Sequence, residues 1–393
     1  MEKKSVLDVD LDGKRVFCRV DFNVPVYNGT ISDDTRIIEA LPTIKYIVDR
    51  GGKLILASHR GRPKGKVDEE LRLKIVGDRL AELIGIPVLS LSESTGIDVR
   101  NAVAKMNKGD IILLENVRFH PGEETNDTNL SKEFAELADL YVNDAFGTAH
   151  RAHASTAGIA EFLPAVAGLL MLKEIKVLGE HLISPAHPYT AIIGGAKVKD
   201  KIEVISSLLD RADNILIGGG LANNFIKAMG YEVGKSILEE DKIELAQMLI
   251  FQAEQMGVKL MIPVDVVVAR EISEDAESWV VPIDAIPEDV YALDIGPETV
   301  MQYTVAIACA KLIIWNGPMG LFEIDKFSKG TVQIAESVAN SCAVTIVGGG
   351  DSLAALKKAD VVEKISHIST GGGASLDIAQ GTQLPAVVAL DDK

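Results

Sequence analysis

The segment Gly348–Ser352, with the sequence Gly-Gly-Gly-Asp-Ser, combines residue types that suit a phosphate and a metal ion. It directly follows the apolar and β-branched residues Val344–Val347 and precedes a helical pattern at 353–358. A strand that enters a helix through glycines leaves bare backbone N–H groups at the helix N-terminus, where the helix dipole also favours negative charge. Asp351 would be a natural ligand for Mg²⁺, which prefers oxygen ligands beside phosphate. Taken alone, the segment could equally be a tight turn without a ligand.

A second candidate site consists of basic residues in the first 160 positions. They all lie at or near predicted strand-to-helix junctions: Arg19, Arg36, His59, Arg62, Arg118 and Arg151. The planar fork of arginine matches two oxygens of a carboxylate or phosphate at once. One such arginine would more often form a surface salt bridge. The whole set, in a chain of net charge −17, indicates a small, multiply anionic ligand.

The second half carries glycine, lysine, asparagine and acids at the corresponding junctions, which suits nucleotide phosphates. Lys197 and Lys201 are four residues apart at a predicted helix start, so they share one helix face. A mobile lysine charge suits a phosphoryl group in transit, although a solvated helix face is the ordinary explanation for such a pair. Glu323 could bind ribose hydroxyls, with a plain surface acid as the alternative.

Alternating strands and helices must position these residues. Apolar and β-branched runs predict strands at 15–20, 53–57, 111–114, 190–193, 214–217, 259–262, 312–315, 344–347 and 367–368. Helical spacing predicts helices at 34–50, 70–84, 134–138, 200–209, 353–358 and 374–380. The alternation predicts an α/β fold with parallel sheets, in which ligands bind at the carboxyl ends of the strands. A long helix and connector at 172–188 separate the two halves.

Length and composition restrict the class of protein. A chain of 393 residues exceeds one ordinary core, so two domains are expected. The acidic net charge argues against nucleic-acid and anionic-membrane partners, and no apolar run is long enough to span a membrane. The first residues soon become acidic, so no signal peptide is expected. The widely spaced Cys18, Cys309 and Cys342 are expected to be reduced, buried thiols of a cytoplasmic protein.

A small polyanion in one half and a Mg²⁺-nucleotide in the other predict phosphoryl transfer between them. Such transfer needs mainly alignment and cationic stabilisation of the equatorial phosphoryl oxygens. A carboxylate acceptor is already a nucleophile at neutral pH, and accordingly no Ser-His-Asp or Cys-His set stands out in the sequence. The sequence contains neither a Gly-x-x-x-x-Gly-Lys-[Ser/Thr] P-loop nor the protein-kinase signatures.

A series of segments, in order along almost the whole chain, resembles the phosphoglycerate kinase family. They are Arg19–Pro25, Leu114–Phe119, Asp144–Gly147, His150–His153, Gly194–Val198, Trp315–Gly320, Gly348–Ser352 and Ser369–Leu376. The resemblance implies reversible transfer between ATP and the carboxylate of 3-phosphoglycerate, giving 1,3-bisphosphoglycerate and ADP, with Mg²⁺ as cofactor. It also implies a cytoplasmic monomer without nucleic-acid or membrane partners.

The resemblance assigns roles to individual residues. The implied 3-phosphoglycerate site consists of Asp21, Phe22, Asn23, Arg36, His59, Arg60, Gly61, Arg62, Arg118 and Arg151. The implied nucleotide site consists of Lys197, Lys201, Ala292, Asn316, Glu323, Gly349, Gly350, Asp351 and Ser352, with Asp351 holding Mg²⁺. The implied catalytic residues are Arg36, Lys197, Gly349 and Gly372.

The family fold implies two Rossmann-like, doubly wound parallel-sheet domains joined by a hinge helix. The N-terminal domain, residues 1–170, would bind 3-phosphoglycerate, and the C-terminal domain, residues 171–379, would bind the nucleotide. The tail, about residues 380–393, would return to the first domain. Closure near residues 160–190 is expected to exclude water and to align the carboxylate with the γ-phosphate.

Some positions depart from the family pattern. Arg60 stands where leucine is common and adds charge beside the substrate loop, and Ala292 stands where a glycine often lines the adenine pocket. Asp377 replaces a usual glutamate, and the segment Gln380–Gln383 lacks a common lysine. The last two changes would affect packing of the tail.

Two other classes of protein remain as alternatives. A nicotinamide dehydrogenase would carry Gly-x-Gly-x-x-Gly after an early strand, but the early strands here end in arginine and histidine. A non-catalytic anion-binding protein with this fold would be expected to lose Arg36, Lys197 or Asp351, and all three are present.

Overall fold

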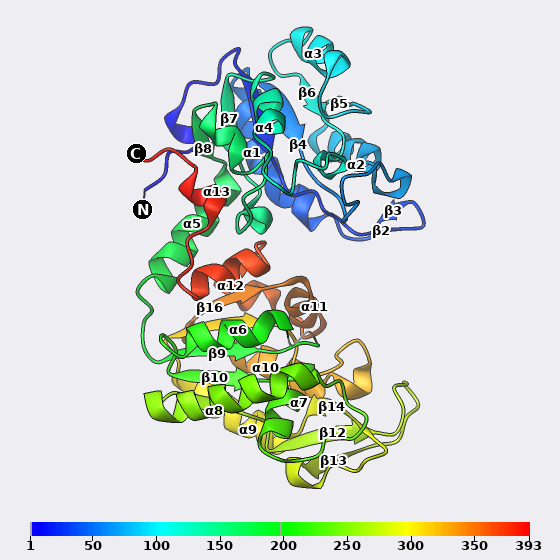
Figure 1. Ribbon diagram of the computed structural model, residues 1–393, viewed down its shortest axis with the longest axis vertical. Helices are drawn as coiled ribbons and strands as arrows, with labels where there is room; N and C mark the ends of the chain where they lie inside the picture. The colour runs from blue at the N-terminus through cyan, green and yellow to red at the C-terminus, as the bar shows by residue number, and fades with distance from the viewer. Residues whose placement is uncertain (1, 197–198) are drawn as a thin grey trace. The chain divides into compact units, whose positions relative to one another are not determined.

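The computed structural model describes residues 2–196 and 199–393, which form two compact units (Figure 1). The N-terminal unit contains the chain up to Gly179 together with Gln383–Lys393, and the C-terminal unit contains Glu180–Thr382. The division falls inside helix α5 (Leu169–Leu182). It lies later than the boundary predicted at residue 170 because this helix continues across that position.

The N-terminal unit is built on a parallel sheet of order β5-β6-β4-β1-β7-β8. Its strands are β1 (Arg15–Arg19), β4 (Lys53–Ala57), β5 (Val88–Ser90), β6 (Ile111–Leu113), β7 (Leu140–Asn143) and β8 (Ala165–Ala167). Its helices are α1 (Thr35–Asp49), α2 (Lys74–Ile84), α3 (Ile97–Ala104), α4 (Thr128–Ala135) and α13 (Pro385–Val388), and a small hairpin joins β2 (Val26–Tyr27) to β3 (Thr30–Ile31). Strand β1 is central because it pairs in parallel with both β4 and β7.

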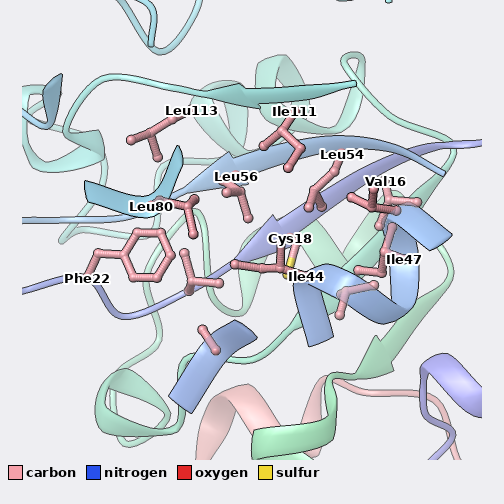
Figure 2. Packing of buried hydrophobic residues seen from close by; sticks show 14 of the residues in the cluster. Val16, Cys18, Phe22, Ile44, Ile47, Leu54, Leu56, Leu80, Ile111 and Leu113 are labelled. Atoms are coloured by element: carbon pink, nitrogen blue, oxygen red, sulfur yellow. The ribbon is translucent and has the colours of Figure 1, made fainter. Parts of the chain in front are cut away.

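Apolar side chains from β1, β4 and α1 form the core of this unit. Figure 2 shows Cys18 of β1, Leu54 of β4 and Ile44 of α1 in this cluster, and all three are fully buried. Strands covered on both faces bury side chains in both directions, so they appear in sequence as continuous apolar runs. This packing fixes the ends of the central strands, where the loops with arginine and histidine begin.

The C-terminal unit repeats the architecture with the order β11-β10-β9-β15-β16-β17. Its parallel strands are β9 (Tyr189–Ile193), β10 (Asn214–Ile217), β11 (Lys259–Met261), β15 (Leu312–Asn316), β16 (Val344–Gly348) and β17 (His367–Ser369). Its helices are α6 (Lys199–Leu208), α7 (Gly219–Ala228), α8 (Ile243–Met256), α9 (Pro297–Cys309), α10 (Lys329–Ala339), α11 (Gly350–Lys358) and α12 (Gly373–Ala379). A smaller antiparallel sheet contains β12 (Asp265–Ala269), β13 (Ser278–Pro282) and β14 (Tyr291–Ile295).

The predicted α/β class with two parallel sheets is confirmed. The helix predicted at 70–84 begins only at Lys74, after a separate 3₁₀ turn at Glu69–Leu71. The helical pattern around 134–138 lies at the end of α4, which stops at Ala135.

The expectation of three buried thiols was wrong. Only Cys18 is buried, while Cys309 and Cys342 are exposed.

The C-terminal residues pack on the N-terminal unit. The backbone N–H of Lys4 donates to the carbonyl of Asp391 (2.9 Å), and that of Ala386 donates to the carbonyl of Ala149 (3.1 Å). Leu390 is buried there. Among the helices of the described residues, none is both long enough and apolar enough to cross a membrane.

Candidate functional site

The basic residues of the N-terminal unit gather at the carboxyl ends of four neighbouring strands. Asp21 follows β1, His59 follows β4, Arg118 lies in the 3₁₀ turn Val117–Phe119 after β6, and Arg151 follows β7. The sheet order places β6, β4, β1 and β7 side by side. In parallel sheets these ends meet at one edge, so the topology brings together residues that are far apart in sequence.

Asp21 forms the centre of this cluster. Its Oδ2 accepts a hydrogen bond from Nη1 of Arg36 at 2.6 Å, and its Oδ1 lies 3.8 Å from Nδ1 of His59. Burial raises the pKa of Asp21, but the positive charges of Arg36 and Arg19, together with the backbone N–H of Asn23, outweigh that effect and hold the pKa below its ordinary value. The carboxylate therefore stays ionised and orients one cation that is partly exposed to solvent.

The loop after β4 is held by polar contacts from two other segments. The backbone N–H of Gly61 donates to Oδ1 of Asn23 at 2.9 Å, and its carbonyl accepts from Nη1 of Arg118 at 3.0 Å. Gly61 has a φ of +64°, and an added Cβ would lie 2.7 Å from Leu71, so glycine is required at this turn. The turn is thereby fixed against the strand ends.

Burial determines the charge states at the cluster. It lowers the pKa of His59 well below its ordinary value, against the opposing attraction of Asp21. Positive charge on Arg19, Arg118 and Arg36 reinforces this lowering. Burial also lowers the pKa of Arg118, to about 10, which leaves the guanidinium charged at neutral pH. The cluster thus presents cationic arginines beside a neutral imidazole.

Other predicted substrate residues have different surroundings. Arg60 donates from Nη1 to the carbonyl of Arg72 at 3.0 Å. Its guanidinium is therefore hydrogen-bonded to that carbonyl and not to a residue of the basic cluster. Phe22 is fully buried and contributes structurally, since its N–H donates to Oγ of Ser58. Arg62 is exposed. Arg151 donates from Nε to Nε2 of His150 at 3.1 Å and influences the pKa of Arg118, which places it beside the cluster.

In the C-terminal unit the glycine-rich junctions follow β9, β10, β15, β16 and β17. Strand β16 ends at Gly348 and α11 begins at Gly350, with Gly349 between them at a φ of +96°. A Cβ on Gly350 would meet no atom within 4 Å, so its backbone is open to an incoming group. Asp351 is exposed in the first turn of α11. The arrangement offers free N–H groups and a carboxylate at one helix end.

Several predicted nucleotide residues hold these loops together. Lys201 donates from Nζ to the carbonyls of Gly194 and Asn316. The amide of Asn316 donates to the carbonyl of Gly348 at 2.9 Å, and the buried Oγ of Ser352 accepts from the N–H of Gly317 at 2.7 Å. The Asn316 and Ser352 side chains therefore support the glycine loops, whose backbones remain the candidates for direct contact.

A pocket that is partly open to solvent lies in this unit. Of the predicted nucleotide residues, Ala292, Glu323 and Asp351 line it. Its other walls are mainly apolar or small, and include Gly219, Gly220, Ile237, Val266, Tyr291, Leu293 and Pro318. A concave, mostly apolar pocket with a few carboxylates at its edge suits a flat aromatic ring joined to polar groups.

Sequence reasoning missed Ser236 and Ile237 because the long connection after α7 shows no periodic pattern. Ser236 accepts at Oγ from the N–H of Ala292 (2.8 Å) and thereby shapes the pocket wall. It also missed Asp294, a buried carboxyl at the pocket. Asp294 accepts from the N–H groups of Ile295 (2.9 Å) and Gly330 (2.7 Å). An acid inside a strand gives no sequence signal that distinguishes it from a surface residue.

Two predicted catalytic residues remain to be placed. Lys197 lies outside the described residues. Gly372 precedes α12 with a φ of +51°, a conformation that favours glycine.

Within the described part of the chain, no group of three or more His, Cys, Asp or Glu side chains could hold a metal ion. Asp351 alone fits Mg²⁺ only as one ligand beside phosphate oxygens and water, which is how Mg²⁺ commonly binds nucleotides.

Comparison with known proteins decides the family. The family model for phosphoglycerate kinase matches residues 6–382, nearly the whole chain. The chain belongs to the phosphoglycerate kinase family. Solved phosphoglycerate kinases have the same fold: that of Coxiella burnetii is 43% identical, and that of Pyrococcus horikoshii OT3 is 33% identical. Each comparison covers 98% of both chains with a TM-score of 0.86.

Membership of the phosphoglycerate kinase family establishes the reaction class. The chain is a glycolytic kinase that transfers a phosphoryl group between ATP and 3-phosphoglycerate. The nicotinamide-dehydrogenase and non-catalytic alternatives are therefore set aside. The two clusters described above are the candidate binding sites for the substrates of this phosphoglycerate kinase reaction.

Proposed function

We propose that the basic cluster of the N-terminal unit binds 3-phosphoglycerate. The observation that carries this proposal is the convergence of arginines and His59 at the ends of four neighbouring strands. Arg118, Arg151 and Arg62 supply positive charge for the phosphate. Asp21 and Asn23 bind or orient hydroxyl groups and the loop after β4. Phe22, Arg60 and Gly61 contribute through the backbone of the same loops.

The pocket of the C-terminal unit is proposed to bind ATP and ADP. A purine would lie against the apolar wall that contains Ala292, and Glu323 at the edge would accept from ribose hydroxyls. The phosphates would then reach the glycines at the start of α11, where the helix dipole and the N–H groups favour them. Lys201, in α6, and Lys197 would compensate phosphate charge.

Mg²⁺ is proposed as the cofactor, with Asp351 as its protein ligand. Bound there, the ion would neutralise phosphate charge and orient the γ-phosphoryl group. The carboxylate of 3-phosphoglycerate needs no general base, since it is ionised at neutral pH. Arg36 would approach the transferring group from the acceptor side, and Lys197 from the nucleotide side. The glycine N–H groups at Gly349 and Gly372 would stabilise negative charge on its oxygens.

Closure about the α5 region is proposed to bring the two bound ligands together and to exclude water. The test is small-angle scattering of the free chain, of each binary complex and of the complex with both substrates. A smaller radius of gyration with both substrates bound is expected. No compaction under saturating ligands would contradict the proposed closure.

The proposed assignment is tested by turnover of the purified chain with ATP, Mg²⁺ and 3-phosphoglycerate, coupled to reduction of the acyl phosphate by a dehydrogenase that consumes NADH. Turnover should require all three components and stop with EDTA. Lys197→Ala should lower turnover by orders of magnitude with little effect on folding, and unchanged turnover would refute its role.

The working form is proposed to be a cytoplasmic monomer. Sedimentation equilibrium of the purified chain tests the monomeric state.

A further inference from the structure

Beneath the basic cluster lies a buried chain of polar contacts that none of the proposed binding roles uses. Arg19 and Glu123 are both fully buried, and Ser155 lies between them. Oγ of Ser155 accepts from Nε of Arg19 at 2.8 Å and donates to Oε1 of Glu123 at 2.6 Å. The N–H of Ser155 also donates to Oε2 of Glu123 at 3.0 Å. The direction of every hydrogen bond is thereby fixed, because Nε of arginine can only donate.

The free end of the Arg19 guanidinium reaches His59. Nη2 of Arg19 lies 3.3 Å from Nδ1 of His59, whereas Oδ1 of Asp21 lies at 3.8 Å from the same nitrogen. A guanidinium has only donors, so the contact requires a lone pair on Nδ1. The contacts of the described residues engage Nδ1 and leave the second ring nitrogen, Nε2, for another partner.

The surroundings of His59 also favour the neutral ring. The charged groups that face it are Asp21 and Arg19 from the β1 segment, Arg36 from α1 and Arg118 from the turn after β6. Burial lowers the pKa of His59 well below its ordinary value, and the three arginines add to this effect. A neutral imidazole with its lone pair on Nδ1 carries its proton on Nε2.

We propose that Arg19 is a positioning residue for the 3-phosphoglycerate site: it holds His59 as the neutral Nε2–H tautomer, and the Glu123–Ser155 pair holds Arg19. His59 then offers a hydrogen-bond donor, and no acceptor, to a ligand. The ligand group at His59 must be a hydrogen-bond acceptor, such as an oxygen of phosphate or carboxylate, and binding through His59 does not depend on protonating the ring. This inference rests on the proposed location of the 3-phosphoglycerate site.

The first test is made on the unmodified full chain with ¹⁵N-labelled histidine. Long-range ¹H–¹⁵N correlation spectra distinguish the two neutral tautomers and the imidazolium, and His59→Gln identifies the His59 signals among the seven histidines. We expect the Nε2–H tautomer throughout the range from about pH 5.5 to about pH 8, where an ordinary histidine titrates. An Nδ1–H tautomer, or an imidazolium in this range, would overturn the proposal.

The second test removes the contact. In Arg19→Gln the Nδ1 lone pair loses its cationic donor, so His59 should populate both tautomers and titrate at a higher pH. The KM for 3-phosphoglycerate should rise about tenfold or more, with a smaller change in kcat, because a charge-assisted donor is misplaced. Ser155→Ala, which removes only the hydroxyl that anchors Arg19, should move both readouts in the same direction if Arg19→Gln does not fold. A folded variant with unchanged His59 spectra would disprove the role of Arg19.

Arg15→Gln is the matched control. Arg15 lies on the same strand, but it pairs with Asp139 at the surface (2.6 Å), so its replacement should leave the His59 spectrum and the KM unchanged. The spectra of the ligand-free protein do not depend on activity. Absence of turnover with 3-phosphoglycerate in the unmodified chain would therefore refute the proposed function without affecting the tautomer result.

Discussion

At the scale of single residues, the buried carboxyl of Asp294 combines a structural role with sensitivity to pH. Its two oxygens accept from the N–H groups of Ile295 and Gly330, which ties β14 to the start of α10 beside the pocket. Burial raises its pKa from 3.8 to about 7, despite these hydrogen bonds. The folded C-terminal unit therefore binds a proton at Asp294 at a pH where the unfolded chain has lost it.

The sign of the resulting stability change follows from linkage. Between about pH 4 and about pH 7 the folded state retains the proton and the unfolded state does not, so raising the pH lowers the free energy of unfolding. The contribution is at most about 1.4 kcal/mol per pH unit for this group. Asp294→Asn is uncharged at every pH and loses this dependence, although its amide cannot accept from both N–H groups and should weaken the fold at low pH.

We therefore expect the stability of Asp294→Asn, relative to the unmodified chain, to increase by about 2–3 kcal/mol from pH 5 to pH 8. Urea unfolding followed by tryptophan fluorescence measures it, because Trp279 and Trp315 both lie in the C-terminal unit. Asp289→Asn is the control: its carboxyl is exposed and paired with Arg270, which holds its pKa below the ordinary value. A constant difference between Asp294→Asn and the unmodified chain would contradict the assigned pKa.

The gathering of His59 and Arg118 at neighbouring strand ends was predictable from sequence, because they belong to a set of basic residues with one chemistry. Arg60 shows the limit of this reasoning: the resemblance places it in the substrate site, and its hydrogen bond to the carbonyl of Arg72 could not be foreseen from sequence. Glu123, Ser155 and Asp294 could not be predicted. Their importance depends on burial and on partners brought close by the sheet topology.

At the scale of elements, the start of α11 offers a sharp test of phosphate binding. Gly350 has open space around its missing Cβ and needs no left-handed conformation, so Gly350→Ala should fold as well as the unmodified chain. If phosphates approach this backbone, a methyl group there should raise the KM for ATP about tenfold or more while leaving the KM for 3-phosphoglycerate nearly unchanged. Steady-state kinetics with a thermal unfolding curve measure both effects.

Substitutions at two other glycines serve as comparisons for Gly350→Ala. Gly349→Ala should also lower stability, by about 1–2 kcal/mol, because its φ of +96° strains an L-residue. Gly257→Ala, at the left-handed end of α8, should lower stability without changing either KM, since that glycine does not line the pocket. An unchanged KM for ATP in Gly350→Ala would place the phosphates elsewhere.

Elements with strong apolar runs were predictable almost to the residue, as β4 at 53–57 and β10 at 214–217 show. The antiparallel strands β12 to β14 were not, because they follow one another without an intervening α-helix and so interrupt the strand–helix alternation, and because β13 is only partly buried. These strands supply Tyr291 and Leu293 to the pocket. The parallel framework of the nucleotide site was therefore accessible from sequence, while its apolar wall was not.

At the scale of the whole molecule, the C-terminal residues belong to the N-terminal unit. Lys3 and Asp392 form an ion pair at 2.8 Å, and Leu384 and Leu390 are buried. Deleting residues 383–393 should expose this apolar surface and destabilise the N-terminal unit by several kcal/mol, at about 1.5–3 kcal/mol per buried leucine. Hydrogen exchange should become faster in β1, β7 and β8, while tryptophan fluorescence reports an unaltered C-terminal unit.

A single substitution distinguishes the loss of side-chain burial from the loss of the whole tail. Leu390→Ala keeps every backbone contact of the tail and removes only side-chain burial, so it should reproduce part of the loss, about 2–5 kcal/mol. Equal destabilisation of both units by the deletion would contradict the assignment of the tail to the N-terminal unit. No destabilisation in either unit would show that its contacts are not maintained in solution.

The two compact units also predict how ligands protect the chain. If each unit binds one substrate, 3-phosphoglycerate alone should slow exchange around residues 58–62 and Arg118, and Mg²⁺-ATP alone should slow exchange at the start of α11. A ligand stabilises only the folded state that contains its binding site. Protection from hydrogen exchange should therefore increase with the ratio of the ligand concentration to its dissociation constant. Helix α5 belongs to both units, and only the two ligands together should slow exchange along its length. Protection of α11 by 3-phosphoglycerate alone would show that the sites are coupled before the second substrate binds, and would require that α5 or the crossing at Thr382–Gln383 transmits a change from one unit to the other.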